Sequence, residues 1–457
     1  MKNLLVVVIF LGAFFVRFWK IEYIPFPDDA DELAHIYAGQ SLFQYGKPIS
    51  WSSFKAINGV WQKVTLRPDT ISSPISLELS QPWFDHTPFL SVLYGAITTF
   101  FGYDFLETPP AILYRLPMLL VSIYSLLLIF VIAKEIFDYK AALLALVLFA
   151  FSPTIVIGQR MLIPENILAA LFLTTFYLLL KKESIFYLIV VGILAGITKI
   201  TGLIIVPIVI FYFLQKKDFK KAIIYLLSTL TLTGAILLFY GYSVDFESFV
   251  KAFTNQSFRL VGWANPTFIL SSAGFQNFIM LDLSYFVIIF AGLHVFMLNK
   301  KTDLSKLLSF AIMACLATIW ATSAEQDMLG WYKLPLFAFL GLSSASFIKE
   351  KNYSLLAILL SLTIITNLGI VRFPTHPLPE TIVLRFVIGL FLLFCSVMIF
   401  LVSSTKKQLL IIVTLLMIYV GQSFYITHTY FKAKCTDRIC PTPVVTSTST
   451  IKNFLNK

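Results

Sequence analysis

The residues best suited to chemistry stand just after the first apolar segment of the chain. Four carboxylates fall within five positions, namely Asp28, Asp29, Asp31 and Glu32. Such a run is commonly the solvated start of a helix, because negative charge complements the positive end of the helix dipole. Here the acids follow an apolar segment and precede a predicted surface helix, which holds them against the lipid. Asp31 and Glu32 are therefore candidate catalytic carboxylates.

Three further candidates are charged residues close to apolar segments. Arg160 and Glu165 flank Pro164, and a capped helix start with a snorkelling arginine explains this pair as well as a binding site does. Lys199 is harder to explain by a structural role alone, since an unpaired ammonium in an apolar hairpin costs several kcal/mol. A phosphate ligand would neutralise Lys199 through charge-assisted hydrogen bonds.

Two aromatic and basic stretches complete the candidate set. His86 opens an apolar stretch with Thr87 and Pro88, and a lone histidine there is usually a satisfied interface residue. Trp331, Tyr332 and Lys333 close a predicted outer loop, where aromatic residues and lysine are typical of the membrane interface belt. Both stretches also have the residue types to bind a polar substrate.

The composition indicates which elements position these residues. The chain has 457 residues, of which 58% are apolar and 13% charged, whereas soluble domains are roughly 25% charged. This composition is typical of an all-α polytopic membrane protein. Apolar stretches long enough to span the hydrocarbon are Leu4–Phe18, Ile112–Ile132, Ala141–Val156, Ile223–Tyr240, Phe278–Leu298 and Leu384–Val402.

Short lysine clusters between the apolar runs give the orientation. Placing them all in the cytoplasm predicts about thirteen spans, with the N-terminus inside and the C-terminal tail outside. The clusters also account for the net charge of +11, and they form no continuous basic face for a nucleic acid. The loops predicted outside are Ile24–Pro110, Gly158–Pro164, a turn at Lys199, Ser243–Asn277, Thr322–Lys333 and Phe373–Glu380.

Some apolar segments are too short or too polar to be ordinary spans. Ile185–Ile197 and Gly202–Leu214 are predicted to form a tilted or half-buried pair that meets at Lys199. Glu32–Tyr45 has a pattern compatible with a helix on the membrane surface, ended by Gly46. His86–Gly102 is predicted to be interfacial or re-entrant, because a full span there would place the later lysine clusters outside.

The cysteines indicate no metal site. Cys315 and Cys395 lie in apolar helices, where a thiol behaves as a small hydrophobic group. Cys435 and Cys440 lie in the polar tail, close enough in sequence to pair in an oxidising exterior.

Several segments, in order, resemble the GT-C superfamily of glycosyltransferases, in the branch of protein O-mannosyltransferases and lipid A aminoarabinose transferases. Asp31-Glu32 resembles the acidic pair of the first outer loop. His86-Thr87-Pro88-Phe89 resembles a His/Lys-Pro-Pro-Leu stretch, with Thr87 in place of the first proline. The other similar segments are Tyr114-Arg115-Leu116-Pro117, Ser152-Pro153 through Arg160 and Glu165, and Thr198-Lys199.

The resemblance implies a fold and a domain organisation. Residues 1–221 would be a GT-C-like catalytic transmembrane module that includes the extracytoplasmic loop 24–110 with its interfacial helices. Residues 222–430 would be transmembrane helices that shape the lipid and acceptor grooves. Residues 431–457 would be an extracytoplasmic tail. The protein is expected in the plasma membrane, with its active site on the extracytoplasmic side.

The resemblance also implies an activity, the inverting transfer of a hexosyl or pentosyl group from a polyprenyl-phosphate donor to an extracytoplasmic lipid, glycan or protein. Asp31 would act as general base, and Glu32 would orient it or share that role. Arg160, Lys199 and His86 would bind the donor phosphate. Glu165, Trp331, Tyr332 and Lys333 would bind the substrate. A cofactor is not required, although Asp31, Glu32 and Glu165 could hold a divalent cation.

Two other classes remain open at this level. A lipid or polysaccharide transporter would also be basic and polytopic, but no acidic residue falls in the middle of a predicted span and no paired halves are visible. A non-catalytic subunit of a glycan assembly complex would tolerate Asp31→Asn, whereas an enzyme would lose turnover and retain donor binding.

Overall fold

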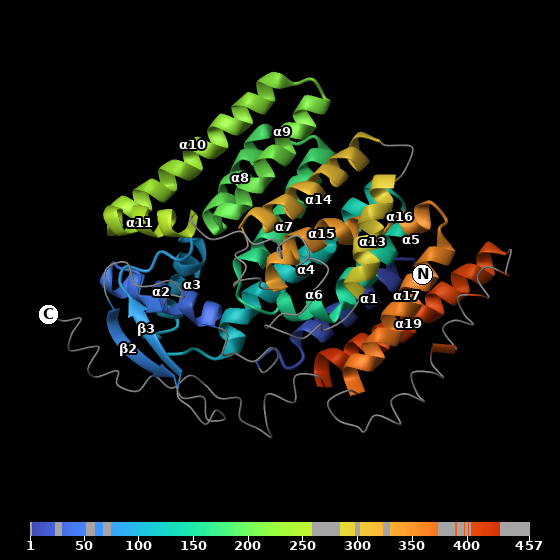
Figure 1. Cartoon of the computed structure of the whole chain (residues 1–457), viewed down its shortest axis with the longest axis horizontal. Coiled ribbons are helices and arrows are strands. Elements are labelled where there is room, and N and C mark those ends of the chain that lie inside the picture. The colour runs from blue at the N-terminus through green and yellow to red at the C-terminus, as the bar shows by residue number, and fades with distance from the viewer. Residues whose placement is uncertain are drawn as a thin grey trace.

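The computed structural model describes residues 2–22, 30–51, 60–66, 75–257, 284–297, 302–322, 330–372, 389–390, 397, 401 and 404–429. These residues form a bundle of helices with a smaller layer of helices α2 and α3 and three strands against one end (Figure 1). Asp28, Asp29, Cys395, Cys435, Cys440, the loop 373–380 and the tail 431–457 lie outside the described residues.

The helices of the first half follow the predicted apolar stretches. They are α1 (Lys2–Phe18), α2 (Ala30–Tyr45), α3 (Phe89–Phe100), α4 (Ala111–Ile136), α5 (Tyr139–Phe151), α6 (Pro153–Gly158), α7 (Pro164–Lys181), α8 (Ile185–Thr198), the 3-10 helix η1 (Ile200–Ile204), α9 (Ile205–Gln215) and α10 (Phe219–Val244). Those of the second half are α11 (Phe246–Ser257), α13 (Ser284–Met297), α14 (Asp303–Thr322), the 3-10 helix η2 (Gly330–Lys333), α15 (Leu334–Ser343), α16 (Ser346–Lys349), α17 (Tyr353–Arg372) and α19 (Thr405–Thr429).

One predicted span is wrong as a single helix. The stretch Ala141–Val156 is divided, because α5 ends at Phe151 and α6 begins at Pro153. Ser152 caps α6 by accepting a hydrogen bond from the backbone N–H of Ile155 at 3.5 Å. Proline lacks the N–H that would continue α5 and has the backbone angle of a first helical turn, so the Ser-Pro pair ends one helix and starts the next.

Among the described residues, four helices are long and apolar enough to cross a membrane by themselves, namely α4, α10, α14 and α19. Several shorter apolar helices pack between them, including α8 and the continuous pair η1 and α9. The predicted break at Lys199 is confirmed, since α8 ends at Thr198 and η1 begins at Ile200. The tilt of this pair in the membrane stays a prediction. The total of about thirteen spans stays a prediction.

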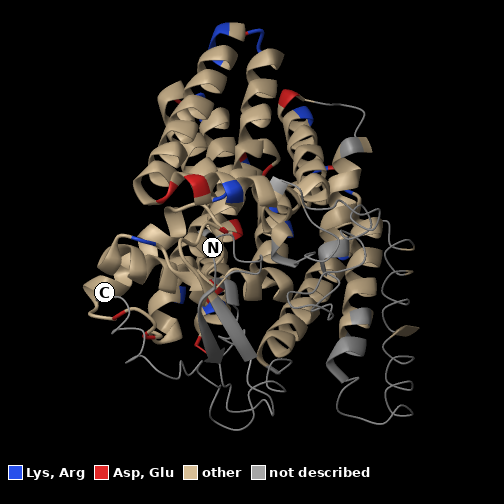
Figure 2. Cartoon of the chain, turned by 60° about the vertical axis from the view of Figure 1, so that its left-hand side comes forward, with Lys and Arg blue, Asp and Glu red and all other residues tan. Residues whose placement is uncertain are grey.

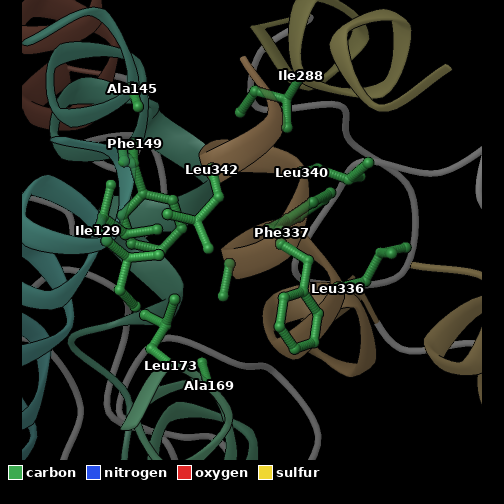
Figure 3. Packing of buried hydrophobic residues seen from close by; sticks show 14 of the residues in the cluster. Ile129, Ala145, Phe149, Ala169, Leu173, Ile288, Leu336, Phe337, Leu340 and Leu342 are labelled. Atoms are coloured by element: carbon green, nitrogen blue, oxygen red, sulfur yellow. The ribbon is translucent and has the colours of Figure 1, made fainter. Parts of the chain in front are cut away.

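The core of the bundle surrounds α15. Every residue from Leu334 to Ser343 is buried, as expected for a helix that is apolar on all faces. Figure 3 shows its Leu336, Phe337 and Leu342 among side chains from neighbouring helices, including Phe149 of α5 and Leu173 of α7. Helices from both halves of the sequence therefore share one core.

The layer at the end of the bundle comes from the first long loop. Helix α2 is confirmed, and its residues from Glu32 to Ser41 are all buried against the rest of the protein. It crosses α3 where Gly39 meets Gly95, and a Cβ on Gly39 would lie 2.2 Å from the carbonyl oxygen of Ser91. Helix α3 has 12 residues, about 18 Å, which is too short for the hydrocarbon core.

The loop also contains strands that the all-α prediction missed. Strands β1 (Ser50–Trp51), β2 (Val60–Leu66) and β3 (Ile75–Ser80) form an antiparallel sheet in the order β1-β3-β2. Their short alternating segments are masked in the sequence by the much stronger hydropathy signal of the helices. The described residues are predominantly helical, and the strands among them all come from this loop.

Lysines from several of the clusters predicted on the cytoplasmic side contact residues in the loops that carry other clusters. Lys181 pairs with Glu135 at 3.0 Å, Lys216 pairs with Asp303 at 2.9 Å, and the Lys349 ammonium donates to the carbonyl of Phe137 at 3.4 Å. Figure 2 shows charged residues mostly at helix ends and in loops, with tan ribbon between them. The grouping of these loops on one side of the bundle agrees with the predicted topology.

Candidate active site

A cavity of about 380 Å³ lies where several of the loops predicted on the outer side of the membrane meet. Its walls come from the loop before α3, the start of α7, the break between α8 and η1, helix α11, the end of α14 and the η2–α15 segment. The polar lining residues are Asp85, His86, Thr87, Glu165, Lys199, Thr201, Gln256, Thr318, Thr322 and Tyr332. Three loops predicted on the outer side of the membrane, 24–110, 243–277 and 322–333, thus line one cavity together with the turn at Lys199 and the start of α7.

The cavity extends into the apolar bundle. It is lined along α7 from Glu165 to Phe172 and along α14 from Thr322 to Cys315. The ends of each stretch are seven residue steps apart, which corresponds to a length of about 10 Å at 1.5 Å per residue. The charged residue Glu165 lines the cavity at the start of α7, and the deeper lining of the two helices is mostly apolar, with Thr318 as a polar exception. The cavity therefore suits a ligand with an anionic or polar head and a hydrocarbon tail.

Lys199 is held at the mouth of the cavity by a carboxylate and an aromatic ring. Its ammonium lies 2.5 Å from Oε1 of Glu165 and 4.3 Å from the centre of the Tyr332 ring. The Lys199 side chain is 17% exposed and that of Glu165 is 4% exposed. Glu165 is in the first turn of α7, where the helix dipole favours a carboxylate. Three of the predicted binding residues, Lys199, Glu165 and Tyr332, are therefore in contact.

His86 lines the same cavity and belongs to a cluster of three rings. Its ring centre lies 4.7 Å from that of His35 and 5.6 Å from that of Trp83, and the His35 ring meets Trp83 edge-on at 5.4 Å. His35 is in α2, one helical turn after Asp31, so positions 31 and 35 share a helix face. The ring cluster joins the acidic start of α2 to the cavity.

Glu32 has a different environment from the cavity residues. Its carboxylate accepts two hydrogen bonds from Arg115 of α4, at 3.0 Å from Nε and 2.5 Å from Nη2, and one from the backbone N–H of Leu162 at 2.8 Å. Both side chains are fully buried. Glu32 therefore joins α2 to α4 and to the loop before α7. Arg115 is not among the predicted site residues, although an arginine in an apolar helix requires a buried partner.

Arg160 lies apart from the cavity lining. It is fully buried and donates to the carbonyl oxygen of Val16 at the end of α1. The nearby Arg17 is also buried, and it donates to Gln159 at 2.7 Å and to the carbonyl of Ala150 at 2.6 Å. These contacts tie α1 to α5 and to the loop after α6. The structure thus brings Lys199 and His86 together in the cavity and places Arg160 elsewhere.

The remaining predicted site residues are only partly described. Asp31 lies in the first turn of α2 and Trp331 in η2, but their side chains are outside the described part of the structure. Lys333 is fully buried and is not a lining residue of the cavity, and burial lowers its pKa to about 7. Within the described residues, no three His, Cys, Asp or Glu side chains gather into a group that could hold a metal ion.

His35 gives a prediction for the dependence of stability on pH. Burial, and to a smaller extent the charge of Lys199, lowers its pKa from 6.5 to about 3. The unfolded chain binds this proton below pH 6.5 and the folded chain does not, so the free energy of unfolding falls as the pH falls below 6.5. At about 1.4 kcal/mol per pH unit, the loss at pH 5 is about 2 kcal/mol. His35→Phe is expected to remove this loss of stability at low pH. The measurement is the free energy of unfolding at several pH values between 5 and 7. If it depends on pH as in the wild type, His35 is not the group responsible.

Comparisons with known proteins give a partial family match and a shared fold. Residues 85–240 match the family of dolichyl-phosphate-mannose-protein mannosyltransferases. That stretch holds the cavity residues Asp85, His86, Thr87, Glu165 and Lys199. No curated protein sequence matches the chain significantly.

Two solved membrane enzymes share the fold along nearly the whole chain. ArnT from Cupriavidus metallidurans, in a structure with bound undecaprenyl phosphate, is 13% identical with a TM-score of 0.57, over 92% of this chain and 77% of ArnT. Its structure in the apo state has a TM-score of 0.59. The Archaeoglobus fulgidus oligosaccharyltransferase in its apo form is 13% identical with a TM-score of 0.51, over 93% of this chain and 56% of that enzyme.

Proposed function

From the premise that this chain has the fold and the partial family match of a GT-C glycosyltransferase, we propose that it transfers one sugar from a polyprenyl-phosphate donor to an acceptor outside the cytoplasm. The observation that carries the proposal is the cavity with Lys199 at its mouth and apolar walls about 10 Å long. A phosphate next to the Lys199 ammonium would leave the polyprenyl chain free to follow the apolar wall of α14 and α15.

The chemistry is a single displacement with inversion. The acceptor oxygen attacks the anomeric carbon, the bond from that carbon to the phosphate oxygen breaks, and the polyprenyl phosphate leaves with the electron pair. The acceptor proton passes to a carboxylate that acts as general base. The leaving phosphate is a stable anion, so it needs nearby cationic charge rather than a strong acid.

The residues divide between these tasks. Lys199 is proposed to hold the phosphate, and His86 to donate a further hydrogen bond to it. Asp31 is proposed as the general base, because it shares a helix face with His35, whose ring packs against the cavity residue His86. Glu32 is proposed to orient α2 through Arg115 and Leu162. Arg160 is not part of the proposal, since it lies apart from the cavity lining.

A resident metal ion is not required by this scheme, because Lys199 supplies the positive charge for the leaving group. Asp31 and Glu165 are the oxygen ligands that would bind a divalent cation if one takes part. Dialysis against a chelator, followed by addition of Mg²⁺ or Mn²⁺, tests this point directly.

The experiment that tests the function uses the purified full-length protein in proteoliposomes. Undecaprenyl-phosphate-linked mannose, glucose, galactose and arabinose are supplied with a cell-envelope extract as the source of acceptors. Release of undecaprenyl phosphate with one donor, and transfer of its labelled sugar to an acceptor, is the expected result. A folded protein that releases lipid phosphate from none of these donors would contradict the proposal and favour a transporter.

Lys199→Met is expected to weaken donor binding and turnover. Losing a charged hydrogen bond to the phosphate should lower kcat/KM roughly 10- to 100-fold. Binding of undecaprenyl phosphate alone should fall by a similar factor, as measured by its stabilisation of the protein against heat. Lys251→Met is the matched control, since Lys251 is an exposed lysine of α11 that pairs with Glu247 and does not line the cavity. Equal effects of the two variants would exclude a specific role for Lys199.

A further inference from the structure

We propose that Thr87 and Glu165 form a subsite for the hydroxyl groups of the donor sugar, and that this subsite sets the sugar specificity. The inference deepens the proposed function and depends on it. Both residues line the cavity, and both are almost completely buried, with 6% of Thr87 and 3% of Glu165 exposed. They come from the loop before α3 and from the first turn of α7.

Each residue has a buried polar atom that no described residue contacts by a hydrogen bond. These atoms are Oγ1 of Thr87 and Oε2 of Glu165. Leaving such an atom unsatisfied costs about 1–3 kcal/mol, and buried polar groups in native proteins nearly always have a partner. Their position in the wall of an open cavity means that a ligand can supply the missing hydrogen bonds.

The two atoms match the chemistry of a sugar. A carboxylate oxygen accepts a hydrogen bond from a sugar hydroxyl, and the threonine hydroxyl can both donate and accept. Oε1 of Glu165 is already paired with Lys199, the residue proposed to hold the phosphate. The free oxygen of the same carboxylate therefore lies beside the phosphate position, where a sugar joined to that phosphate must be.

The loop that carries Thr87 is fixed by a helix far away in the sequence. The amide of Gln256 in α11 donates to the carbonyl of Asp85 at 2.7 Å and to that of Phe84 at 3.4 Å. The Phe84 ring packs edge-on against Phe249 of α11 and Tyr240 of α10, at 5.5 and 5.7 Å. Gln256 is thus a positioning residue that keeps the loop against the cavity.

Two other observations favour recognition of one sugar unit. The cavity volume of about 380 Å³ is at the lower end of the range of roughly 300–1,000 Å³ for small-molecule sites, which fits a monosaccharide phosphate better than an oligosaccharide. Thr87 also stands where the similar family stretch has a proline, so its hydroxyl is a feature of this chain. The proposed role of the subsite is therefore to select the donor sugar, not to take part in the transfer step.

The test compares hydrogen-bonding groups on the protein and on the donor. Thermal stabilisation of the full-length protein gives the dissociation constants of undecaprenyl-phosphate-linked mannose, glucose and galactose. The same measurement is made for the four monodeoxy analogues of the donor that binds most tightly. The wild type is expected to bind one analogue roughly 10- to 100-fold more weakly than its parent. Thr87→Val is expected to bind that analogue and the parent equally, because the shared hydrogen bond is already lost.

Three further variants make the result specific. Thr87→Ser keeps the hydroxyl and should keep the wild-type discrimination, and Thr87→Ala should behave as Thr87→Val does if the valine disturbs folding. Thr318→Val is the matched control, because Thr318 also lines the cavity but its hydroxyl already donates to the carbonyl of Ala314 at 2.9 Å. It should discriminate as the wild type does.

Either of two outcomes would overturn the inference. One is full discrimination retained by both Thr87→Val and Thr87→Ala. The other is wild-type protein that binds the sugar-linked donors no more tightly than undecaprenyl phosphate alone. Both are measured by binding, so they can occur while release of lipid phosphate is still observed, which separates them from a failure of the proposed function.

Discussion

Asp31→Asn is expected to lower the turnover number by about 10²- to 10⁴-fold, the usual contribution of a general base, while donor binding is retained. Asparagine keeps the shape of the side chain but cannot take the acceptor proton. The measurement is a single-turnover assay of sugar transfer alongside the dissociation constant of the same donor. A loss confined to the turnover number is the result that identifies a catalytic carboxylate.

The neighbouring acid Asp28 provides the control for this prediction. If the acidic run only favours the start of α2, then Asp28→Asn and Asp31→Asn should each have a small effect on stability, of about 0.3–1 kcal/mol, and neither should affect turnover strongly. If Asp31 is the base, only its variant should lose turnover. Normal turnover by Asp31→Asn would remove Asp31 from the mechanism and support a non-catalytic binding subunit.

The second large effect is expected from the buried pair between Arg115 and Glu32. Arg115→Met should lower the free energy of unfolding by about 3–5 kcal/mol, because it leaves the Glu32 carboxylate buried without its countercharge. Both partners are fully buried and joined by two hydrogen bonds. The measurement is unfolding of the protein in mixed micelles of a mild and a denaturing detergent.

Two further variants show whether the effect comes from the buried charge. The double variant Arg115→Met with Glu32→Leu should regain much of the lost stability, since an apolar pair replaces an unpaired charge. Lys181→Met breaks an ion pair whose side chains are 36% and 50% exposed, and it should cost at most about 1 kcal/mol. If Arg115→Met is as stable as Lys181→Met, Glu32 is not held by Arg115 and its proposed orienting role is lost.

Much of the architecture could be predicted because its signals are local. Helix α2 was predicted at Glu32–Tyr45 and is observed at Ala30–Tyr45, since Gly46 adopts a positive φ of +71° that ends it. The break at Lys199 was also predicted, from the length of the two apolar stretches on either side. The strands of the first loop and the division at Ser152 were missed, because the strong hydropathy of the surrounding segments hides such weak signals.

The candidate site was predictable only in its components. Lys199, Glu165, His86 and Tyr332 were each selected from residue type and position, and the structure brings all four to one cavity. The sequence did not reveal that Lys199 pairs with Glu165 or that Arg115 pairs with Glu32. It also left out His35, Thr87 and Gln256 as cavity or neighbouring residues, because their importance depends on elements that pack against them from elsewhere in the chain.

Residue types and their order along the chain were therefore enough to predict a lipid environment, two sets of loops and the type of chemistry that the acidic and basic residues can perform. These properties depend on hydropathy and charge summed along short stretches. Only the tertiary structure decided which charges meet, since Glu32 and Arg115 are 83 residues apart and Glu165 and Lys199 are 34 apart. Such partners are chosen by how helices pack, and helix packing depends on side-chain fit across the whole bundle rather than on any local pattern.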